Sequence, residues 1–197
     1  ELTFPVRWWS FGPFWRYEQP QKGRTREFFQ WNVDMLGVDS PEADAEVIAI
    51  GVTFMKSVGL SPQQATVFVN NRKLMNAEFA ALGIPQEKRV DALGLVDRRS
   101  KMTPANWDAY ALEIGLSQAQ LDGLRAVLDD FDLWKKDEEL TRLFVALEAL
   151  GVKEYVKFDP NIVRGRLYYT STVFEAFDTS GSVKRSTVSL KLLVQIT

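Results

Sequence analysis

The stretch that decides the fold covers residues 15–36 and reads WRYEQPQKGRTREFFQWNVDML. It predicts an aromatic-rich strand that ends near Tyr17, a turn at Pro20 and Gly23, and a second strand at residues 28–36. Alternate side chains of a strand share a face and lie about 7 Å apart. One face of the second strand is predicted to be core and carries Phe29, Trp31, Val33 and Met35; the other carries Phe28, Gln30, Asn32 and Asp34.

The second of these faces is a candidate binding surface. Asn and Asp are uncommon inside strands, and Arg16 and Glu18 share a face of the partner strand. Arginine binds carboxylates and phosphates as a planar fork, while acidic and amide groups bind an ammonium or a ring N–H, and an aromatic ring stacks on a base. The alternative is a hairpin with a solvated outer face and a basic tip formed by Lys22, Arg24 and Arg26.

The composition is that of a globular domain and excludes several kinds of site. The chain has 197 residues, of which 46% are hydrophobic and 25% charged, with a net charge of −2. It contains no Cys and no His, which excludes disulfides, thiolate zinc sites and Ser-His catalysis. The chain shows neither an apolar run of membrane-spanning length nor a signal-peptide pattern, so a soluble cytoplasmic protein is predicted.

Two stretches resemble a known family. Residues 14–28, FWRYEQPQKGRTREF, resemble motif 2 of class II aminoacyl-tRNA synthetases in the form typical of histidyl-tRNA synthetases. Residues 163–175, VRGRLYYTSTVFE, resemble the histidine-specific motif of the same family. The order and separation of the two stretches also fit that family.

The resemblance implies an α+β fold, in which an antiparallel sheet of the class II synthetase core is flanked by helices and carries an all-helical insertion. Residues 1–76 and 159–197 would form the catalytic core, and residues 77–158 would form the insertion. Helices are predicted from Ser40 to Gly59, at 73–82, from Thr103 to Gly115, after Ser117 and at 137–150. Strands are predicted at 65–70, 168–177 and 188–196. A hairpin loop is predicted at 179–181.

For ATP, the resemblance implies four ligands, which are Arg16, Glu18, Arg24 and Phe28. Arg16 would bridge the α-phosphate and the substrate carboxylate and is a candidate catalytic residue, as is Arg164, a fixed cation near the same phosphate. Arg24 would reach the far phosphates, Glu18 the edge of the adenine and Phe28 its face. Mg²⁺ would accompany ATP, without a metal site built from protein ligands.

For histidine, the resemblance implies a pocket formed by Gln30, Asp34, Arg164, Tyr168 and Tyr169. Two positions depart from the family. Asp34 stands where Glu is usual, and Arg166 stands where an apolar residue is usual, so that a second cation lies beside Arg164 in the sequence.

Motif 1, motif 3 and the anticodon domain of the family have no counterpart in the sequence. We therefore expect a fragment or truncated form of a histidine–tRNA ligase that charges tRNA poorly alone. The alternative is a non-catalytic relative such as the regulatory subunit of ATP phosphoribosyltransferase.

The expected partners are histidine, ATP, tRNA and a second copy of the chain. The tRNA acceptor stem would contact the loop Lys22–Arg26, and the insertion could add Arg98, Arg99 and Lys101, unless that basic cluster is only a solvated face. Self-association is expected through the strand at 188–196 or an exposed sheet face, because unpaired edges and apolar faces attract partners.

Overall fold

The structure is a computed structural model that describes residues 3–17, 19, 25–163 and 169–180. It has the expected α+β character and divides into two compact units. The first unit comprises residues 1–67, 142–156 and 175–197, and the second comprises residues 68–141 and 157–174. These units do not follow the boundaries expected for a core and an insertion, and the insertion at 77–158 stays a prediction.

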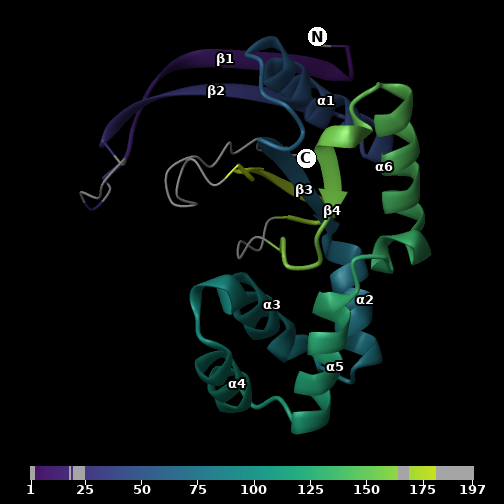
Figure 1. Ribbon diagram of the computed structural model, residues 1–197. Helices are drawn as coiled ribbons and strands as arrows, with labels where there is room; N and C mark the ends of the chain where they lie inside the picture. The colour runs from purple at the N-terminus through teal and green to yellow at the C-terminus, as the bar shows by residue number, and fades with distance from the viewer. Residues whose placement is uncertain (1–2, 18, 20–24, 164–168, 181–197) are drawn as a thin grey trace. The chain divides into compact units, whose positions relative to one another are not determined.

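The first unit begins with the hairpin that the sequence predicts. Strands β1 (Val6–Trp15) and β2 (Glu27–Leu36) pair antiparallel over their whole length and lie side by side as a long ribbon (Figure 1). Only part of the predicted core face is buried: Val33 and Met35 are, whereas Phe29 is 68% exposed, contrary to the prediction. The reason is that burial depends on which other element packs against each residue of this face. The ring of Trp31 contacts Phe54 of helix α1 (Pro41–Ser57), whereas the ring of Phe29 pairs with that of Phe11, which is itself exposed.

Helix α1 starts as its sequence predicts but buries a different face. The Ser40 hydroxyl accepts a hydrogen bond from the Ala43 N–H at 3.2 Å, and Pro41 occupies the first turn. Helical spacing predicts an apolar stripe formed by Val47, Ile50, Phe54 and Val58. The stripe is wrong for two of these four, since Phe54 and Val58 are exposed, and Ile48, Val52 and Met55 are buried instead. The helix carries apolar side chains of its own on several sides, so periodicity alone does not determine which face is buried.

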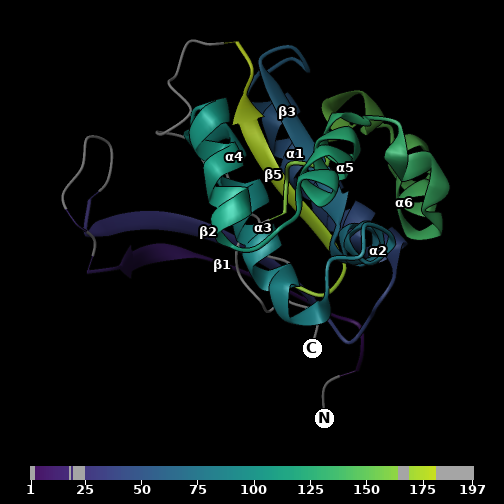
Figure 2. The same cartoon turned by 90° about the horizontal axis from the view of Figure 1, so that it is seen from below.

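Three strands form a second sheet in the order β4–β3–β5, where β3 is Ala65–Asn71, β4 is Val156–Phe158 and β5 is Thr172–Asp178. Figure 2 shows β3 and β5 side by side. The strand predicted at 65–70 is confirmed. The strand predicted at 168–177 corresponds to β5, which begins later, at Thr172, and the sequence did not predict β4. The strand predicted at 188–196 and the end of the loop at 179–181 lie outside the described residues.

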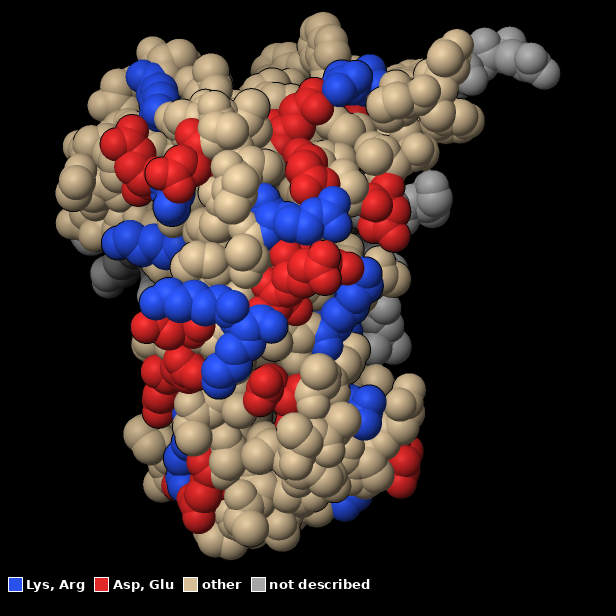
Figure 3. Space-filling model, turned by 90° about the vertical axis from the view of Figure 1, so that its right-hand side faces the viewer, with Lys and Arg blue, Asp and Glu red and all other residues tan. Residues whose placement is uncertain are grey.

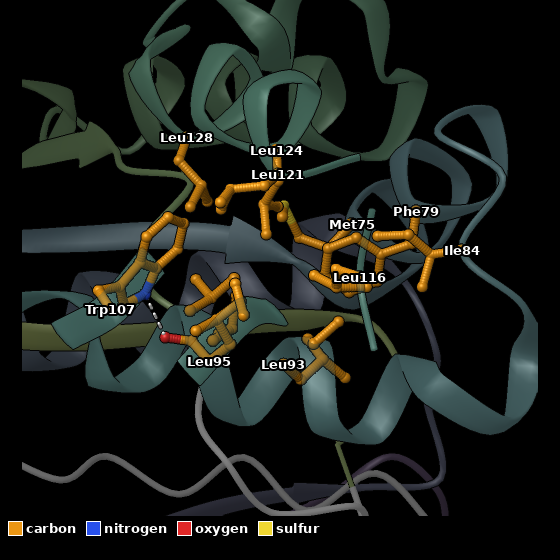
Figure 4. Packing of buried hydrophobic residues seen from close by; sticks show 14 residues of the cluster. Met75, Phe79, Ile84, Leu93, Leu95, Trp107, Leu116, Leu121, Leu124 and Leu128 are labelled. Carbon is orange, nitrogen blue, oxygen red and sulfur yellow. Dashed lines mark hydrogen bonds between the residues drawn. The ribbon is translucent and has the colours of Figure 1, made fainter. Parts of the chain in front are cut away.

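The helices of the second unit pack around one apolar cluster. They are α2 (Arg72–Ala81), α3 (Arg89–Arg98), α4 (Pro104–Glu113) and α5 (Gln118–Asp129). Leu121, Leu124 and Leu128 of α5 point into the cluster, and the Trp107 indole donates a hydrogen bond to the Leu95 carbonyl at 2.8 Å (Figure 4). Thr103 caps α4, and Ser117 and Gln120 form a capping box at the start of α5.

Helical spacing predicts an apolar stripe at Leu140, Leu143, Phe144 and Leu147, and helix α6 (Glu138–Ala149) buries all four residues. Short 3₁₀ helices lie between the longer elements, at Gln86–Lys88, Arg99–Lys101, Leu133–Lys136 and Lys153–Tyr155. None of the helices in the described ranges is long and apolar enough to cross a membrane.

Candidate functional site

The candidate site is one face of the β1–β2 hairpin, in the first unit. The strand register places Phe14 opposite Phe28, Gly12 opposite Gln30, Ser10 opposite Asn32 and Trp8 opposite Asp34, so all eight residues share that face. A side chain built on Gly12 would meet no atom within 4 Å, which leaves open space beside Gln30. The face is therefore polar along β2 and accessible at its middle.

Arg16 lies at the loop end of this face and is oriented by two neighbours. Its backbone N–H donates to the Arg26 carbonyl at 2.9 Å, which extends the hairpin pairing beyond β1. Its guanidinium lies over the Phe28 ring, with Cζ 4.9 Å from the ring centroid, and Nη2 is 3.5 Å from the Gln30 Oε1. The structure thus brings together three of the residues predicted for the site: a cation, an aromatic face and an amide.

The amides of β2 continue this arrangement along the strand. Gln30 donates through Nε2 to the Asn32 Oδ1, and Asn32 donates through Nδ2 to the Ser10 hydroxyl at 3.3 Å. These bonds hold both amides in one line beside Arg16. Sequence analysis did not identify Ser10 as part of the site, although a serine within an aromatic strand is a usable indication.

Asp34 lies at the far end of the face, opposite Trp8. Partial burial raises the pKa of its carboxyl above the ordinary value, because desolvation disfavours the charged form. Among the residues that the structure describes, none forms an ion pair with Asp34. A partly desolvated carboxylate of this kind suits a cationic or N–H-donating ligand.

For the other residues predicted for the site, the structure does not determine a position relative to the hairpin. Glu18, Arg24, Arg164 and Tyr168 lie outside the described residues. Tyr169 is half-buried in the second unit, three residues before β5 begins. That these residues share one concavity with Arg16 stays a prediction.

The opposite face of the hairpin is aromatic and largely exposed, which the sequence did not predict. Trp9, Phe11, Trp15 and Phe29 are between 64% and 68% exposed, and Phe11 and Phe29 have ring centroids 5.6 Å apart. A shallow apolar groove of about 450 Å³ adjoins Trp31 and Phe54. Arg7 joins this region to α1 through both oxygens of Glu46, at 2.6 and 2.9 Å, and these bonds lower the pKa of that carboxyl.

The basic cluster considered for tRNA is engaged in contacts within the second unit. Arg99 bonds Asp129 at 2.9 Å and Asn161 at 3.1 Å, and Lys101 bonds Asp97 at 2.8 Å. Arg98 lies over the Tyr110 ring. On the face drawn in Figure 3, basic and acidic side chains are interspersed and form no large patch of one sign.

No metal site emerges among residues 3–17, 19, 25–163 and 169–180, since no group of three or more acidic side chains there could hold an ion.

A sequence profile described as histidyl-tRNA synthetase matches residues 2–185. The chain belongs to the histidyl-tRNA synthetase family. Among curated relatives, the histidine–tRNA ligase of Natronomonas pharaonis is 36% identical over 94% of this chain and 45% of its own length. That of Picrophilus torridus is 37% identical over 93% of this chain and 46% of its own length. The chain therefore spans about half the length of these synthetases.

Solved structures share the fold of this synthetase-family chain. The histidyl-tRNA synthetase from Nostoc sp. superposes with a TM-score of 0.79 at 23% identity, over 92% of this chain and 46% of that one. An ATP phosphoribosyltransferase regulatory subunit/histidyl-tRNA synthetase from Bacillus halodurans gives a TM-score of 0.75 at 24% identity, over 92% and 50%. Both likenesses confirm the predicted fold class.

Proposed function

We propose that this chain takes part in histidine–tRNA ligation by binding histidine and ATP on the polar face of the hairpin. The observation that supports this most is the grouping of Arg16, Phe28 and Gln30 on one accessible face, with Asp34 further along it. Membership of the synthetase family gives the grouping its chemical meaning, because the first reaction joins an amino acid to ATP and releases pyrophosphate.

In the proposed reaction, the histidine carboxylate attacks the α-phosphorus of ATP. Both reacting groups, the carboxylate and the phosphate, are negatively charged. The protein therefore has to orient them and to offset their charge. Arg16 would lie between the α-phosphate and the carboxylate, where a planar guanidinium can donate to both. Adenine would stack on Phe28, the ring that the guanidinium covers in this structure. ATP would thus move the guanidinium off the ring and toward the phosphates.

At the other end of the face, Gln30 and Asp34 would bind the ammonium or ring N–H groups of histidine. The hydrogen bonds from Gln30 through Asn32 to Ser10 support this, since they fix the amides before the ligand arrives. The family resemblance adds Arg164 as a fixed cation near the α-phosphate, Tyr168 and Tyr169 as pocket residues, and Glu18 and Arg24 as further ATP ligands. Mg²⁺ would enter with the phosphates of ATP and offset their charge.

For tRNA, we propose that the acceptor stem meets the loop Lys22–Arg26 rather than the helical insertion. Charged contacts to the phosphate backbone dominate binding to nucleic acids. Arg99 and Lys101 are paired with carboxylates, which reduces what they can offer to phosphates. The resemblance to motif 2, by contrast, places three cations in the short loop. The cytoplasm, where tRNA charging takes place, is the proposed location.

A homodimer is proposed for the assembled protein. The support is the exposed aromatic face of the hairpin, because contiguous exposed apolar rings in a globular protein mark a contact surface. A second copy would cover Trp9, Phe11, Trp15 and Phe29. The edge strand at 188–196, which the sequence also suggests for self-association, lies outside the described residues.

The second candidate is a regulatory relative that binds histidine without activating it. One structural neighbour, from Bacillus halodurans, is named as both a regulatory subunit and a synthetase, and the likeness to it is one of fold. The two readings differ in chemistry, since only a ligase exchanges pyrophosphate with ATP in the presence of histidine.

The experiment is ATP–pyrophosphate exchange with histidine, compared with other amino acids, together with the mass of the protein in solution. The proposal predicts exchange that depends on histidine, weak for this chain alone and stronger for a longer protein that carries it, and a dimeric mass. Histidine binding without exchange in the longer protein would favour the regulatory reading. Robust exchange from a monomer of this chain would contradict both the expected weakness and the dimer.

A further inference from the structure

Gly12, in the middle of β1, is a glycine that the hairpin itself does not require. Glycine inside a strand loses more conformational freedom on folding than other residues and has no side chain to pack, so its presence there usually has a local cause. One such cause is a backbone conformation that other residues avoid, but Gly12 is not among the glycines of positive φ. Another is a bulge, but β1 and β2 pair one residue to one residue from Val6 to Trp15.

Crowding does not require this glycine either. A Cβ built on Gly12 meets no heavy atom of the described chain within 4 Å beyond its two chain neighbours, whereas a Cβ on Gly123 would collide with the Leu82 side chain. Pro13, the next residue, favours extended backbone at position 12, which alanine adopts as well. Turn, bulge and packing therefore leave Gly12 unexplained, and the remaining common cause of a strand glycine is the close approach of a ligand.

The space above Gly12 adjoins side chains that can bind a ligand. Toward the loop end of the same face, the Phe14 and Phe28 rings are stacked with their centroids 6.4 Å apart. This pair forms an aromatic wall on one side of the space, and its flat rings suit a base rather than a charged group.

The other sides of the space are polar. One step further along the face, the Asn32 Nδ2 donates to the Ser10 hydroxyl at 3.3 Å. The Arg16 Nη2 reaches to 3.5 Å from the Oε1 of Gln30, which lies directly across the ladder from Gly12. A cation, two amides and a hydroxyl thus adjoin a position without a side chain, and this combination suits an anionic part of a ligand.

We propose that Gly12 is a specificity-determining residue, whose missing side chain leaves room for the part of the ligand where histidine and ATP join. Along the face, position 12 lies about 7 Å from Phe28, the proposed adenine contact, and about 13 Å from Asp34, the proposed histidine contact. The α-phosphate and the amino-acid carboxylate would lie between those two ends. The inference rests on the proposed function, since it concerns the same binding face.

The test compares Gly12→Ala and Gly12→Val with a matched control, Gly94→Ala. Gly94 lies inside α3, has no positive φ, and a Cβ built on it also meets no described atom within 4 Å. Two quantities are measured on each chain: the melting temperature and the calorimetric affinity for each of two probes. The probes are adenosine and a stable analogue of histidyl-adenylate, in which a sulfamoyl group replaces the phosphate.

All three variants should melt no lower than the unaltered chain, because no special backbone conformation or close contact depends on either glycine. Gly12→Ala should weaken binding of the joined analogue by about tenfold, and Gly12→Val by more, since each added methyl group occupies space that the ligand needs. Affinity for adenosine should change by less than about twofold, because adenosine carries neither the phosphate nor the amino acid. Gly94→Ala should bind both probes as the unaltered chain does.

Unchanged affinity of both Gly12 variants for the joined analogue would overturn the inference. An equal loss of adenosine affinity would also overturn it, since the space would then belong to the nucleoside. A lower melting temperature for Gly12→Ala would show that the strand itself needs the glycine, which contradicts the proposal too. Failure of the unaltered chain to bind the joined analogue would instead overturn the proposed binding face, and the role of Gly12 with it.

Discussion

Asp34 shows at the scale of one residue how binding and stability can oppose each other. Its carboxyl is predicted to meet histidine, yet partial burial raises its pKa in the folded chain. A folded-state pKa above the unfolded value of about 3.9 means that the folded chain binds the proton more tightly. The free energy of unfolding therefore falls as pH rises from the unfolded pKa through the folded one.

Asp34→Asn is predicted to be at least as stable as the unaltered chain at pH 7 while binding histidine more weakly. Thermal unfolding between pH 3 and pH 7 would show the variant gaining relative stability as pH rises. The exposed carboxylate of Asp39 offers the control Asp39→Asn, which should leave histidine affinity unchanged. A variant that loses stability at pH 7 would show that the ionised carboxylate has a stabilising partner.

Arg72, a buried cation at the first position of α2, shows what a sequence cannot reveal at this scale. Read along the chain, it is one more cation at the start of a helix, and only the fold places it against the Val163 carbonyl. The one local indication is the polar run Asn70, Asn71 and Arg72 at the end of an apolar strand, because buried polar groups require partners.

The elements that the sequence predicted best are those whose signals are local. The caps at Ser40, Thr103 and Ser117 each satisfy a nearby backbone N–H, so a few residues determine them. The exposure of Phe29 could not be predicted in this way. Alternation in β2 places Phe29 on the same face as Val33, but burial depends on whether another element covers it, and α1 contacts that face at Trp31.

The packing of α5 gives a prediction at the scale of an element. Leu124 is fully buried among the helices of the second unit, so Leu124→Ala should lower the free energy of unfolding by about 2–5 kcal/mol. Leu112 on α4 is 50% exposed, and Leu112→Ala should change the free energy of unfolding by less than about 1 kcal/mol. Urea unfolding of the two variants measures both values, and equal losses would contradict this account of the core.

For the whole molecule, the sequence predicted the fold class, which the structure confirms, through two motifs with specific residues. The binding face of the hairpin stays a prediction. The sequence did not predict the division into units. Residues 157–174 fall in one compact unit with residues 68–141, and a run of helices along the sequence does not indicate that grouping.

The central claim is that the face carrying Phe28, rather than the aromatic face opposite, binds ATP. Phe28 and Phe29 are adjacent in β2 and point to opposite faces, so they form a matched pair. Calorimetric titration of ATP into Phe28→Leu and Phe29→Leu, both confirmed as folded, compares the two faces directly. Loss of stacking on one base is worth about 1–3 kcal/mol, so Phe28→Leu should weaken ATP binding by roughly tenfold while Phe29→Leu leaves it within about twofold. Equal losses, or a larger loss for Phe29→Leu, would contradict the assignment of the binding face.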